Sequence, residues 1–398
     1  MISAASRPYI DASVPVLREH GLAITRTFYR NMFAAHPELG NLFNMGNQAN
    51  GSQQQSLAAA VFAYAANIDN AAALTPVLNR IVQKHVSVGI TAEHYPIVGR
   101  HLIGAIQETL GDAASAPLLA AWDDAYASLA RLLIATEKAL YVQAGVAPGQ
   151  LRAMRVGARR TESEDVASFT LHVTDGLPLP PFKPGQYVSV AVTFDDGSRQ
   201  LRQYSLSDAP NGTSLRISVK REASRDAIPQ GRVSNWIHDK VGPGSVLQIS
   251  LPCGEFTPDA ESLEPIVLLS AGVGITPMIA VLNRIAALQP ARHVVFAHAA
   301  QDRQHHSHQA DLAAAKAAMP NLQTAIFYAS GSEPGAGIHQ GMMDVSRLPA
   351  WPHAQAHVHL CGPLGFMQAQ WLALVEAGVP AARLQREVFG PEMLDYLN

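Results

Sequence analysis

Residues 265–283 read PIVLLSAGVGITPMIAVLN, an uncharged run whose first half has the pattern of a strand and whose second half has that of a helix. The run is long enough for a membrane span, which needs about 18 or more apolar residues. Gly272, Gly274 and Pro277 interrupt it, however, and a buried strand–turn–helix unit explains these breaks better than a spanning helix. The sequence therefore predicts no transmembrane segment and an α/β domain that starts at Pro265.

Apolar runs of strand length alternate with helical stretches from this point onward. Strands that are buried on both faces are continuously apolar, and their alternation with helices is typical of a doubly wound parallel sheet. A biased run, His305-His306-Ser307-His308, has no predicted role. The predicted α/β domain covers residues 265–398, with strands at Ile266–Ser270, His293–His298, Thr324–Tyr328 and His357–Cys361.

Two other patterns precede this domain. In residues 151–264, short runs alternate apolar and polar side chains between Gly, Pro and Asp turns, which predicts a small antiparallel β-barrel. Residues 1–141 have a helical period and predict an all-α domain. Residues 142–150 are predicted to be a linker. Three domains fit a chain of 398 residues, given about 150 residues per domain.

The composition excludes several classes of function. Lys plus Arg is 29 and Asp plus Glu is 32, without a basic block, so the sequence predicts no nucleic-acid partner. Cys253 and Cys361 are the only cysteines, too few for a disulfide scaffold or a thiolate zinc site. The first residues lack an apolar signal-peptide region, so we expect a cytoplasmic protein.

Two polar side chains fall on apolar helix faces in residues 1–141. His85 follows Ile81 by four residues, and Glu137 follows Leu133 by four, so both point towards a core. A buried carboxylate is costly unless it is paired or hydrogen-bonded. A core histidine is the ordinary alternative, but the two anomalies together indicate a cofactor pocket.

The same region resembles the globin domain of bacterial flavohaemoglobins, and the similarity extends over essentially the whole chain. The resemblance rests on the segments Phe28-Tyr29, Pro37-Glu38-Leu39, Phe43-Asn44-Met45, Asn50-Gly51, Lys84-His85 and Tyr95. It implies that haem b is bound, with His85 as the iron ligand and Phe43 in the cofactor pocket. It further implies catalytic roles for Tyr29 and Gln53 on the distal side, Leu57 above the iron, and Tyr95 and Glu137 around His85.

Elementary chemistry agrees with these implied roles. If Glu137 accepts the second imidazole proton of His85, the ligand gains anionic character, which favours oxygen activation over storage. The Tyr29 hydroxyl can donate to bound dioxygen, a contact worth about 1.5–3 kcal/mol when the acceptor is charged. An ordinary packing tyrosine is the alternative for Tyr29 alone.

A flavin motif is expected in the β-barrel region. Arg202-Gln203-Tyr204-Ser205 resembles the Arg-x-Tyr-Ser motif of ferredoxin reductase-like flavoproteins, which implies bound FAD. Gly185 and Gly231 could be mere turn glycines, but their motifs occur in the family order. These supporting motifs contain Tyr187 in the first, and Val233 and Ser234 at a helix start suited to phosphate in the second.

The α/β domain carries the expected nicotinamide-coenzyme motifs. Gly272-Val273-Gly274-Ile275-Thr276-Pro277 follows a strand and resembles a pyridine-nucleotide loop, with Thr276 predicted to cap the next helix and Pro277 to lie in its first turn. The resemblance implies that NAD(P)H binds, without deciding between NADH and NADPH. It also assigns cofactor contacts to Cys361-Gly362-Pro363 and Glu387-Val388-Phe389-Gly390-Pro391, although Val388 and Ile275 depart from residues that are common in the family.

The resemblance as a whole implies a nitric oxide dioxygenase, which converts nitric oxide and dioxygen to nitrate at a haem reduced by NAD(P)H through FAD. Three alternatives stay open. An apolar distal pocket could admit a lipid or hydroperoxide for reduction, the haem could only store or sense oxygen, or the protein could be a flavoprotein reductase without haem.

Overall fold

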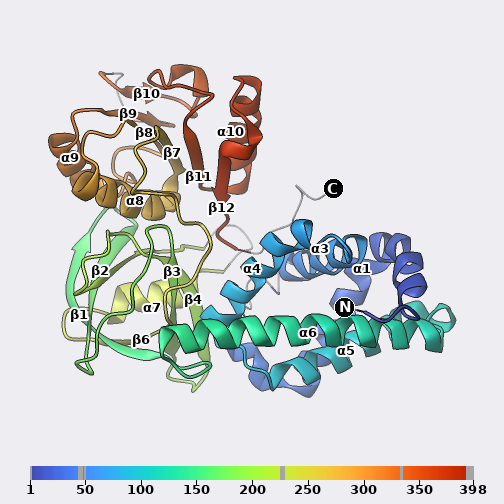
Figure 1. The fold of residues 1–398 in the computed structure, drawn as a ribbon. Helices are drawn as coiled ribbons and strands as arrows, with labels where there is room; N and C mark the ends of the chain where they lie inside the picture. Colours follow the sequence, from blue (N-terminus) through green and yellow to red (C-terminus); the bar gives the residue numbers. More distant parts are fainter. Residues whose placement is uncertain (1, 44–47, 49–50, 225–228, 332–334, 391–398) are drawn as a thin grey trace. The chain divides into compact units, whose positions relative to one another are not determined.

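The computed structural model describes residues 2–43, 48, 51–224, 229–331 and 335–390. The chain forms two compact units (Figure 1). One contains the helical region up to Leu151 together with residues 191–202, and the other contains residues 152–190 and 203–389. Within these described ranges, no helix is both long and apolar enough to cross a membrane.

The described part of the chain before Arg152 is entirely helical, which confirms the predicted all-α domain. α1 packs against α3, α5 and α6 around a core that includes Ile10, Ile24 and Met32. The last helix ends at Ala144, three residues later than the predicted helical period, and Gly145 follows it in a left-handed conformation. The elements are α1 (Arg7–Ala35), η1 (Pro37–Asn41), α3 (Ser52–Ala66), α4 (Ala71–Val88), α5 (His94–Leu110), η2 (Gly111–Ala113) and α6 (Ala116–Ala144).

A six-stranded sheet with the order β4-β3-β6-β1-β2-β5 follows, and it confirms the predicted antiparallel β fold. β1 pairs antiparallel with β2 and β6, and β2 pairs antiparallel with β5. An isolated bridge between Leu206 and Ile217 brings the end of β4 next to β5, so the sheet curls. Its elements are β1 (Arg152–Thr161), β2 (Val166–Val173), β3 (Tyr187–Thr193), β4 (Arg199–Ser205), β5 (Leu215–Lys220), α7 (Arg232–Lys240) and β6 (Val246–Ile249).

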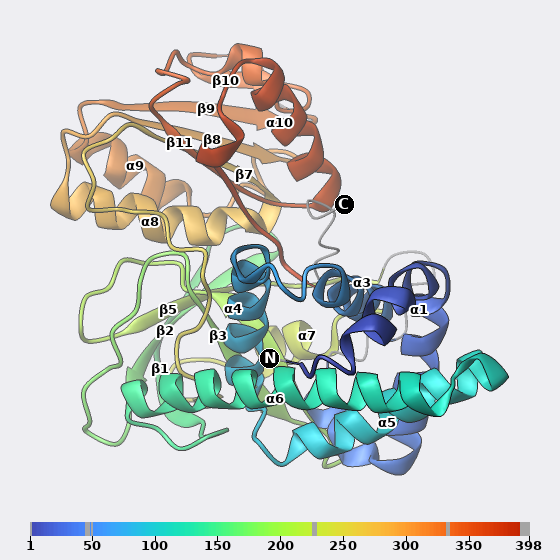
Figure 2. The ribbon, with the colours of Figure 1, turned by 45° about the vertical axis from the view of Figure 1, so that its right-hand side comes forward.

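The third region contains a parallel sheet with the order β10-β9-β8-β7-β11-β12, as predicted from the apolar runs. One core forms under α8 and α9 and the other under α10, so helices cover both faces (Figure 2). Its strands are β7 (Ile266–Ala271), β8 (Val294–Ala300), β9 (Leu322–Tyr328), β10 (Ile338–Gln340), β11 (His357–Cys361) and β12 (Leu384–Glu387). Its helices are η3 (Gly272–Gly274), α8 (Ile275–Leu288), α9 (Gln309–Ala318), η4 (Val345–Arg347), α10 (Leu364–Glu376) and η5 (Ala381–Arg383).

The predicted helix cap at Thr276 is wrong. The turn after β7 is a 3₁₀ turn over Gly272–Gly274, and α8 already begins at Ile275 with Gly274 as its N-cap. Thr276 therefore lies inside the first turn, where its hydroxyl donates to the Val273 carbonyl over 3.0 Å. Glycine at position 274 permits this early start, because the turn passes close to β11.

Candidate functional site

His85, Tyr95 and Glu137 come together from three different helices, α4, α5 and α6. Nδ1 of His85 lies 2.8 Å from Oε1 of Glu137, and the Tyr95 hydroxyl donates to the same oxygen over 2.5 Å. Glu137 is buried, whereas the side chain of His85 is 32% exposed. Burial and the hydrogen bond to Glu137 both raise the pKa of Tyr95, so its hydroxyl keeps the proton that it donates.

This geometry fixes which nitrogen of His85 is free to bind a metal. A carboxylate only accepts hydrogen bonds, so the hydrogen bond to Glu137 requires the proton on Nδ1. Nε2 then keeps its lone pair, which is the arrangement of a neutral imidazole that ligates iron through one nitrogen and donates through the other.

Tyr29 lies in an aromatic cluster on the inner side of α1. Its ring is 5.8 Å from those of Phe33 and Phe43, and the residue is 5% exposed. Burial raises the pKa of Tyr29 to about 12, against a smaller opposing effect of a hydrogen bond with the Gln53 side chain. The phenol therefore stays protonated at neutral pH and can donate a hydrogen bond, and the Gln53 amide lies next to it.

Helix α3 connects the Tyr29 cluster with the helix that carries His85. Leu57 packs against the core of the helical region, which includes Tyr29, while Ala59, Ala60 and Ile81, one turn before His85, pack against Ala63 and Val77. These side chains are only partly buried, although they are apolar and face other helices. The half-covered apolar surface, an imidazole with a free lone pair and a phenol donor together fit a flat apolar group such as haem.

The predicted flavin residues lie along two neighbouring strands of the antiparallel sheet. Tyr187 opens β3 and exchanges two backbone hydrogen bonds of 2.8 Å with Cys253. The Arg202–Ser205 motif, including Gln203 and Tyr204, forms the end of the adjacent strand β4. Gly185 is required before β3, because its φ is +101° and a Cβ there would lie 2.2 Å from the Phe256 carbonyl oxygen.

The second flavin motif forms a helix start, as predicted. α7 begins directly after Gly231, where Val233 is buried and the Ser234 hydroxyl donates to the Gly231 carbonyl over 3.1 Å. α7 packs against β5, which the Leu206–Ile217 bridge brings next to the end of β4.

The two nucleotide motifs meet at the point where the strand order of the parallel sheet reverses. β7 and β11 are neighbours, and Gly272 and Gly362 each follow the carboxyl end of one of them. A Cβ on Gly274 would lie 2.3 Å from the Cys361 carbonyl oxygen, so only glycine fits between the two turns. Ligands of open α/β sheets bind at such switch points.

The remaining predicted residues follow β11 and β12. Cys361 pairs with Glu387 across these strands, and burial, followed by the charge of Glu387, raises the pKa of its thiol well above the usual range. Cys361 is therefore a buried neutral thiol, as expected for a small core residue. Val388 packs against the core, Phe389 is 46% exposed, and Pro391 lies outside the described residues.

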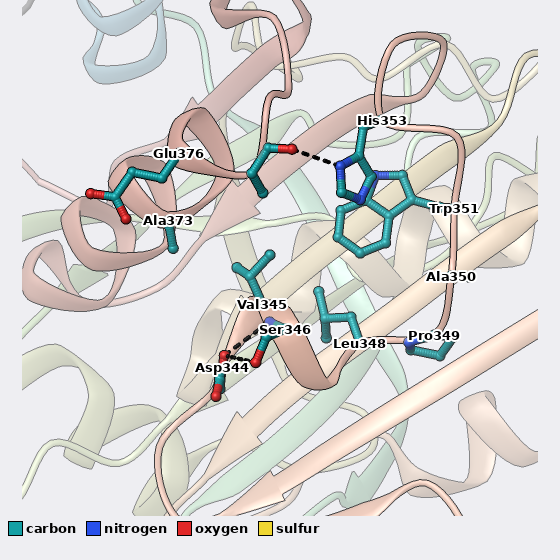
Figure 3. Close-up of a pocket in the computed structure, with 11 residues that line it drawn as sticks. Asp344, Val345, Ser346, Leu348, Pro349, Ala350, Trp351, His353, Ala373 and Glu376 are labelled. Atoms are coloured by element: carbon teal, nitrogen blue, oxygen red, sulfur yellow. Dashed lines mark hydrogen bonds between the residues drawn. The ribbon is translucent and has the colours of Figure 1, made fainter.

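A pocket of about 380 Å³ lies elsewhere in the parallel-sheet region, between η4, the loop before β11 and α10 (Figure 3). Its lining includes Asp344, Trp351, His353 and Glu376, and His353 Nδ1 lies 2.9 Å from the Ala377 carbonyl oxygen. None of the predicted site residues lines this pocket. It is therefore separate from the haem, flavin and nucleotide motifs.

Three family models match successive parts of the chain. The globin family matches residues 26–133, the oxidoreductase FAD-binding domain matches residues 153–257, and the oxidoreductase NAD-binding domain matches residues 268–371.

Curated relatives match over nearly the full length. The flavohaemoproteins of Chromobacterium violaceum and Bordetella parapertussis are 47% and 46% identical to the chain, each covering 98% of it. The match covers 98% and 99% of those relatives, respectively. The chain belongs to the flavohaemoprotein family. The structure of a flavohaemoglobin from Malassezia yamatoensis, solved with bound FAD and haem, is similar to this flavohaemoprotein, with a TM-score of 0.85 and 31% identity. The match covers 98% of this flavohaemoprotein and 100% of the Malassezia chain.

The reductase half has its own solved relative. The FAD- and NAD-binding domain of a nitric oxide dioxygenase from Vibrio cholerae is 36% identical, with a TM-score of 0.56, over 60% of this chain and 99% of that one. The comparisons confirm the predicted family, the three types of fold, and an oxidoreductase built on haem, FAD and NAD(P) domains. The individual roles of the site residues stay predictions.

Proposed function

We propose that this flavohaemoprotein is a nitric oxide dioxygenase with haem b, FAD and NAD(P)H as cofactors. Two molecules of nitric oxide and two of dioxygen give two nitrate ions, while one NAD(P)H is oxidised to NAD(P)⁺ and one proton is released. The observation that carries the proposal is the shared hydrogen bonding of His85 and Tyr95 to buried Glu137. The activity of the Vibrio cholerae relative supports the choice of substrate.

When bound, the haem supplies an iron centre that accepts electrons and activates dioxygen. His85 would hold it through Nε2, and Glu137 would keep the proton on Nδ1 and give the imidazole anionic character. Tyr95 fixes the orientation of the Glu137 carboxylate. This arrangement favours chemistry on oxygen over its reversible storage.

On the side of the site formed by α1, Tyr29 would donate a hydrogen bond from its protonated phenol to a substrate oxygen, and Gln53 would orient that phenol. Leu57 and Phe43 keep water away from the reacting gases, because their side chains pack against the Tyr29 cluster. An apolar, water-poor site suits two small uncharged substrates.

The reductase residues have the roles that their motifs imply. Arg202 would face the FAD pyrophosphate, Tyr187, Tyr204 and Ser205 would contact the flavin, and Val233 and Ser234 would lie at the phosphate. The turns at Gly272–Pro277 and Cys361–Pro363 would hold NAD(P)H, and Glu387–Gly390 would lie against the flavin. We assign the three domains to residues 1–141, 151–264 and 265–398, with a linker at 142–150.

A second candidate is the reduction of lipid hydroperoxides at the same haem. The partly buried apolar side chains of α3, among them Leu57, favour this candidate, because they could cover an acyl chain.

The test is nitric oxide consumption by the purified holoprotein with NADH or NADPH in air, followed with a nitric oxide electrode and a nitrate assay. We expect nitrate to form in equal amount to the nitric oxide consumed. The control is His85→Ala, which should lack the Soret band of bound haem and keep reduction of ferricyanide through FAD. Holoprotein that forms no more nitrate than His85→Ala would refute the proposal, and faster turnover of a lipid hydroperoxide would favour the second candidate.

A further inference from the structure

A group of buried polar side chains joins the antiparallel sheet to α9 in the second unit, outside the motifs described above. At its centre is His308, which is fully buried and ends the His-rich run 305–308. Two carboxylates lie near its Nδ1 atom, that of Asp311, in the first turn of α9, at 2.9 Å and that of Glu162, after β1, at 3.8 Å. The sequence did not reveal this group, because Glu162 lies far along the chain from His308 and Asp311.

Both nitrogens of His308 are used. Nδ1 lies 2.9 Å from Oδ2 of Asp311, and Nε2 lies 3.0 Å from Oγ of Ser218 on β5. Since the carboxylate only accepts, Nδ1 carries a proton, and Nε2 forms the second hydrogen bond with the Ser218 hydroxyl. One imidazole thus joins the strand β5 to the helix α9 by two hydrogen bonds.

Arginines from the antiparallel sheet compensate the charges of this group. Asp311 accepts hydrogen bonds from Arg216 over 3.0 Å and from Arg160 over 2.9 Å, and Arg160 also pairs with Glu162. Burial alone would raise the pKa of Asp311, but the hydrogen bond from His308 and the charge of Arg216 hold it well below its usual range. Every charge in the group therefore has a partner of opposite sign.

The backbone of His308 is strained. Its φ is +60°, the only positive value at a non-glycine residue in the described part of the chain. Such conformations cost of the order of 1 kcal/mol or more and persist only where the surroundings determine them strongly. The contacts of the side chain therefore hold His308 in place.

The group connects the flavin motif with the nucleotide motif. Ser207, two residues after the end of β4, lies 2.8 Å from Ser218 through its Oγ. On the other side, Asn283 of α8 donates to Asp208 over 2.8 Å. α8 is the helix that starts at the nucleotide turn, so polar contacts link the loop after β4 to the helix that follows that turn.

We propose that His308 is a positioning residue for hydride transfer, which fixes the flavin-binding sheet against the nucleotide-binding domain through Ser218 and Asp311. The proposal rests on the FAD and NAD(P)H half of the proposed function and is independent of nitric oxide. Hydride transfer needs reacting atoms about 3–3.5 Å apart, and a misplacement of about 1 Å can cost roughly 100-fold in rate. The gain in rate from a rigid connection between the two parts therefore offsets the cost of the strained backbone at His308.

A cation site is the other possible use of this group. Ligand atoms of Glu162, His308 and Asp311 lie within 4.8 Å of one another. However, Arg160 and Arg216 already neutralise both carboxylates and would repel a cation, so the bridging role fits the charges better.

The decisive variant is His308→Gly in the full-length holoprotein. Glycine accepts the positive φ, so this change removes the imidazole contacts and the strain together. Anaerobic stopped-flow measurement with NADH gives the limiting rate of flavin reduction, the Kd for NADH, and the long-wavelength absorbance of nicotinamide stacked on flavin. We expect the limiting rate to fall about 10-fold or more and the absorbance to weaken, with the Kd changed by less than about twofold.

Two further variants complete the test. Ser218→Ala removes one of the two hydrogen bonds without touching the backbone, and should slow flavin reduction about 2- to 10-fold. The matched control is His353→Ala, which removes a half-buried imidazole of the same domain, away from the flavin and nucleotide motifs, and should leave the rate unchanged.

The double variant His308→Gly/Ser218→Ala should lose less than the product of the two single losses, because both changes break the hydrogen bond between His308 and Ser218. An unchanged rate of flavin reduction in His308→Gly would overturn the proposal. If His308→Gly loses FAD, an unchanged rate in Ser218→Ala would overturn it instead. A double variant whose loss of rate equals the product of the two single losses would also overturn it. Flavin reduction is measured without nitric oxide, so a failure of the proposed dioxygenase activity would not affect this result.

Discussion

The hydrogen bond between His85 and Glu137 leads to a quantitative prediction for the reduction potential of the haem iron. Glu137→Gln keeps the size and the acceptor oxygen of the side chain but removes the negative charge 2.8 Å from Nδ1. An imidazole with anionic character stabilises the more positive, ferric iron. The substitution should therefore raise the midpoint potential.

The magnitude follows from the strengths of the two kinds of hydrogen bond. A bond to a charged group contributes about 1.5–3 kcal/mol, and one between neutral groups about 0.5–1.5 kcal/mol, so the charge is worth about 1–2 kcal/mol. For a one-electron couple, about 59 mV corresponds to about 1.4 kcal/mol. If the whole difference acts on the ferric form, the potential rises by about 40–80 mV.

Spectroelectrochemical titration of the Soret band measures this potential directly. Asp123→Asn, which neutralises an exposed carboxylate on the same helix, is the matched control and should shift the potential by much less. A potential that stays constant or falls in Glu137→Gln, with haem still bound, would show that Glu137 does not tune His85.

Three further predictions concern other parts of the chain. Tyr29→Phe removes the phenol donor and should speed dioxygen loss about 10- to 150-fold in flash photolysis with haem content intact, and an unchanged rate would remove Tyr29 from the mechanism. Gly274→Ala places a Cβ 2.3 Å from the Cys361 carbonyl oxygen. It should lower the free energy of unfolding by about 1–3 kcal/mol, measured in urea, and slow flavin reduction. Gly104→Ala, in open space on α5, should have neither effect. Burial lowers the pKa of His306 to about 4 from 6.5, so the unfolded chain binds the proton first as the pH falls. As the pH falls from 6.5 to 4, the free energy of unfolding should therefore decrease by up to about 3 kcal/mol more in the wild type than in His306→Gln. Equal decreases in the two proteins, measured by urea unfolding, would show that His306 is not the cause.

The regular elements could be predicted because their hydrophobic patterns are long and consistent. The four predicted strands of the parallel sheet occur as β7, β8, β9 and β11, since each is a continuous apolar run between helices. Glu137 could be predicted to face a core from its spacing to Leu133, and its burial is confirmed.

Features that depend on close approach between distant segments could not be predicted. α8 starts two residues earlier than predicted, because the turn at Gly274 adapts to β11, which lies far along the chain. The contact between His308 and Ser218 was missed for the same reason, since the two residues are 90 positions apart and become neighbours only when the antiparallel sheet packs against the start of α9. The biased composition of residues 305–308 was its one local signal.

The incomplete covering of α3 has a consequence for how the protein matures. Without its prosthetic group, the helical region leaves apolar side chains open to water, so cofactor binding contributes directly to the stability of the folded state. Newly made chains should accordingly persist in proportion to the supply of iron and porphyrin, with the unfilled form removed by proteases. Cellular abundance of this protein would then report the nutritional state of the cell as well as the rate of synthesis.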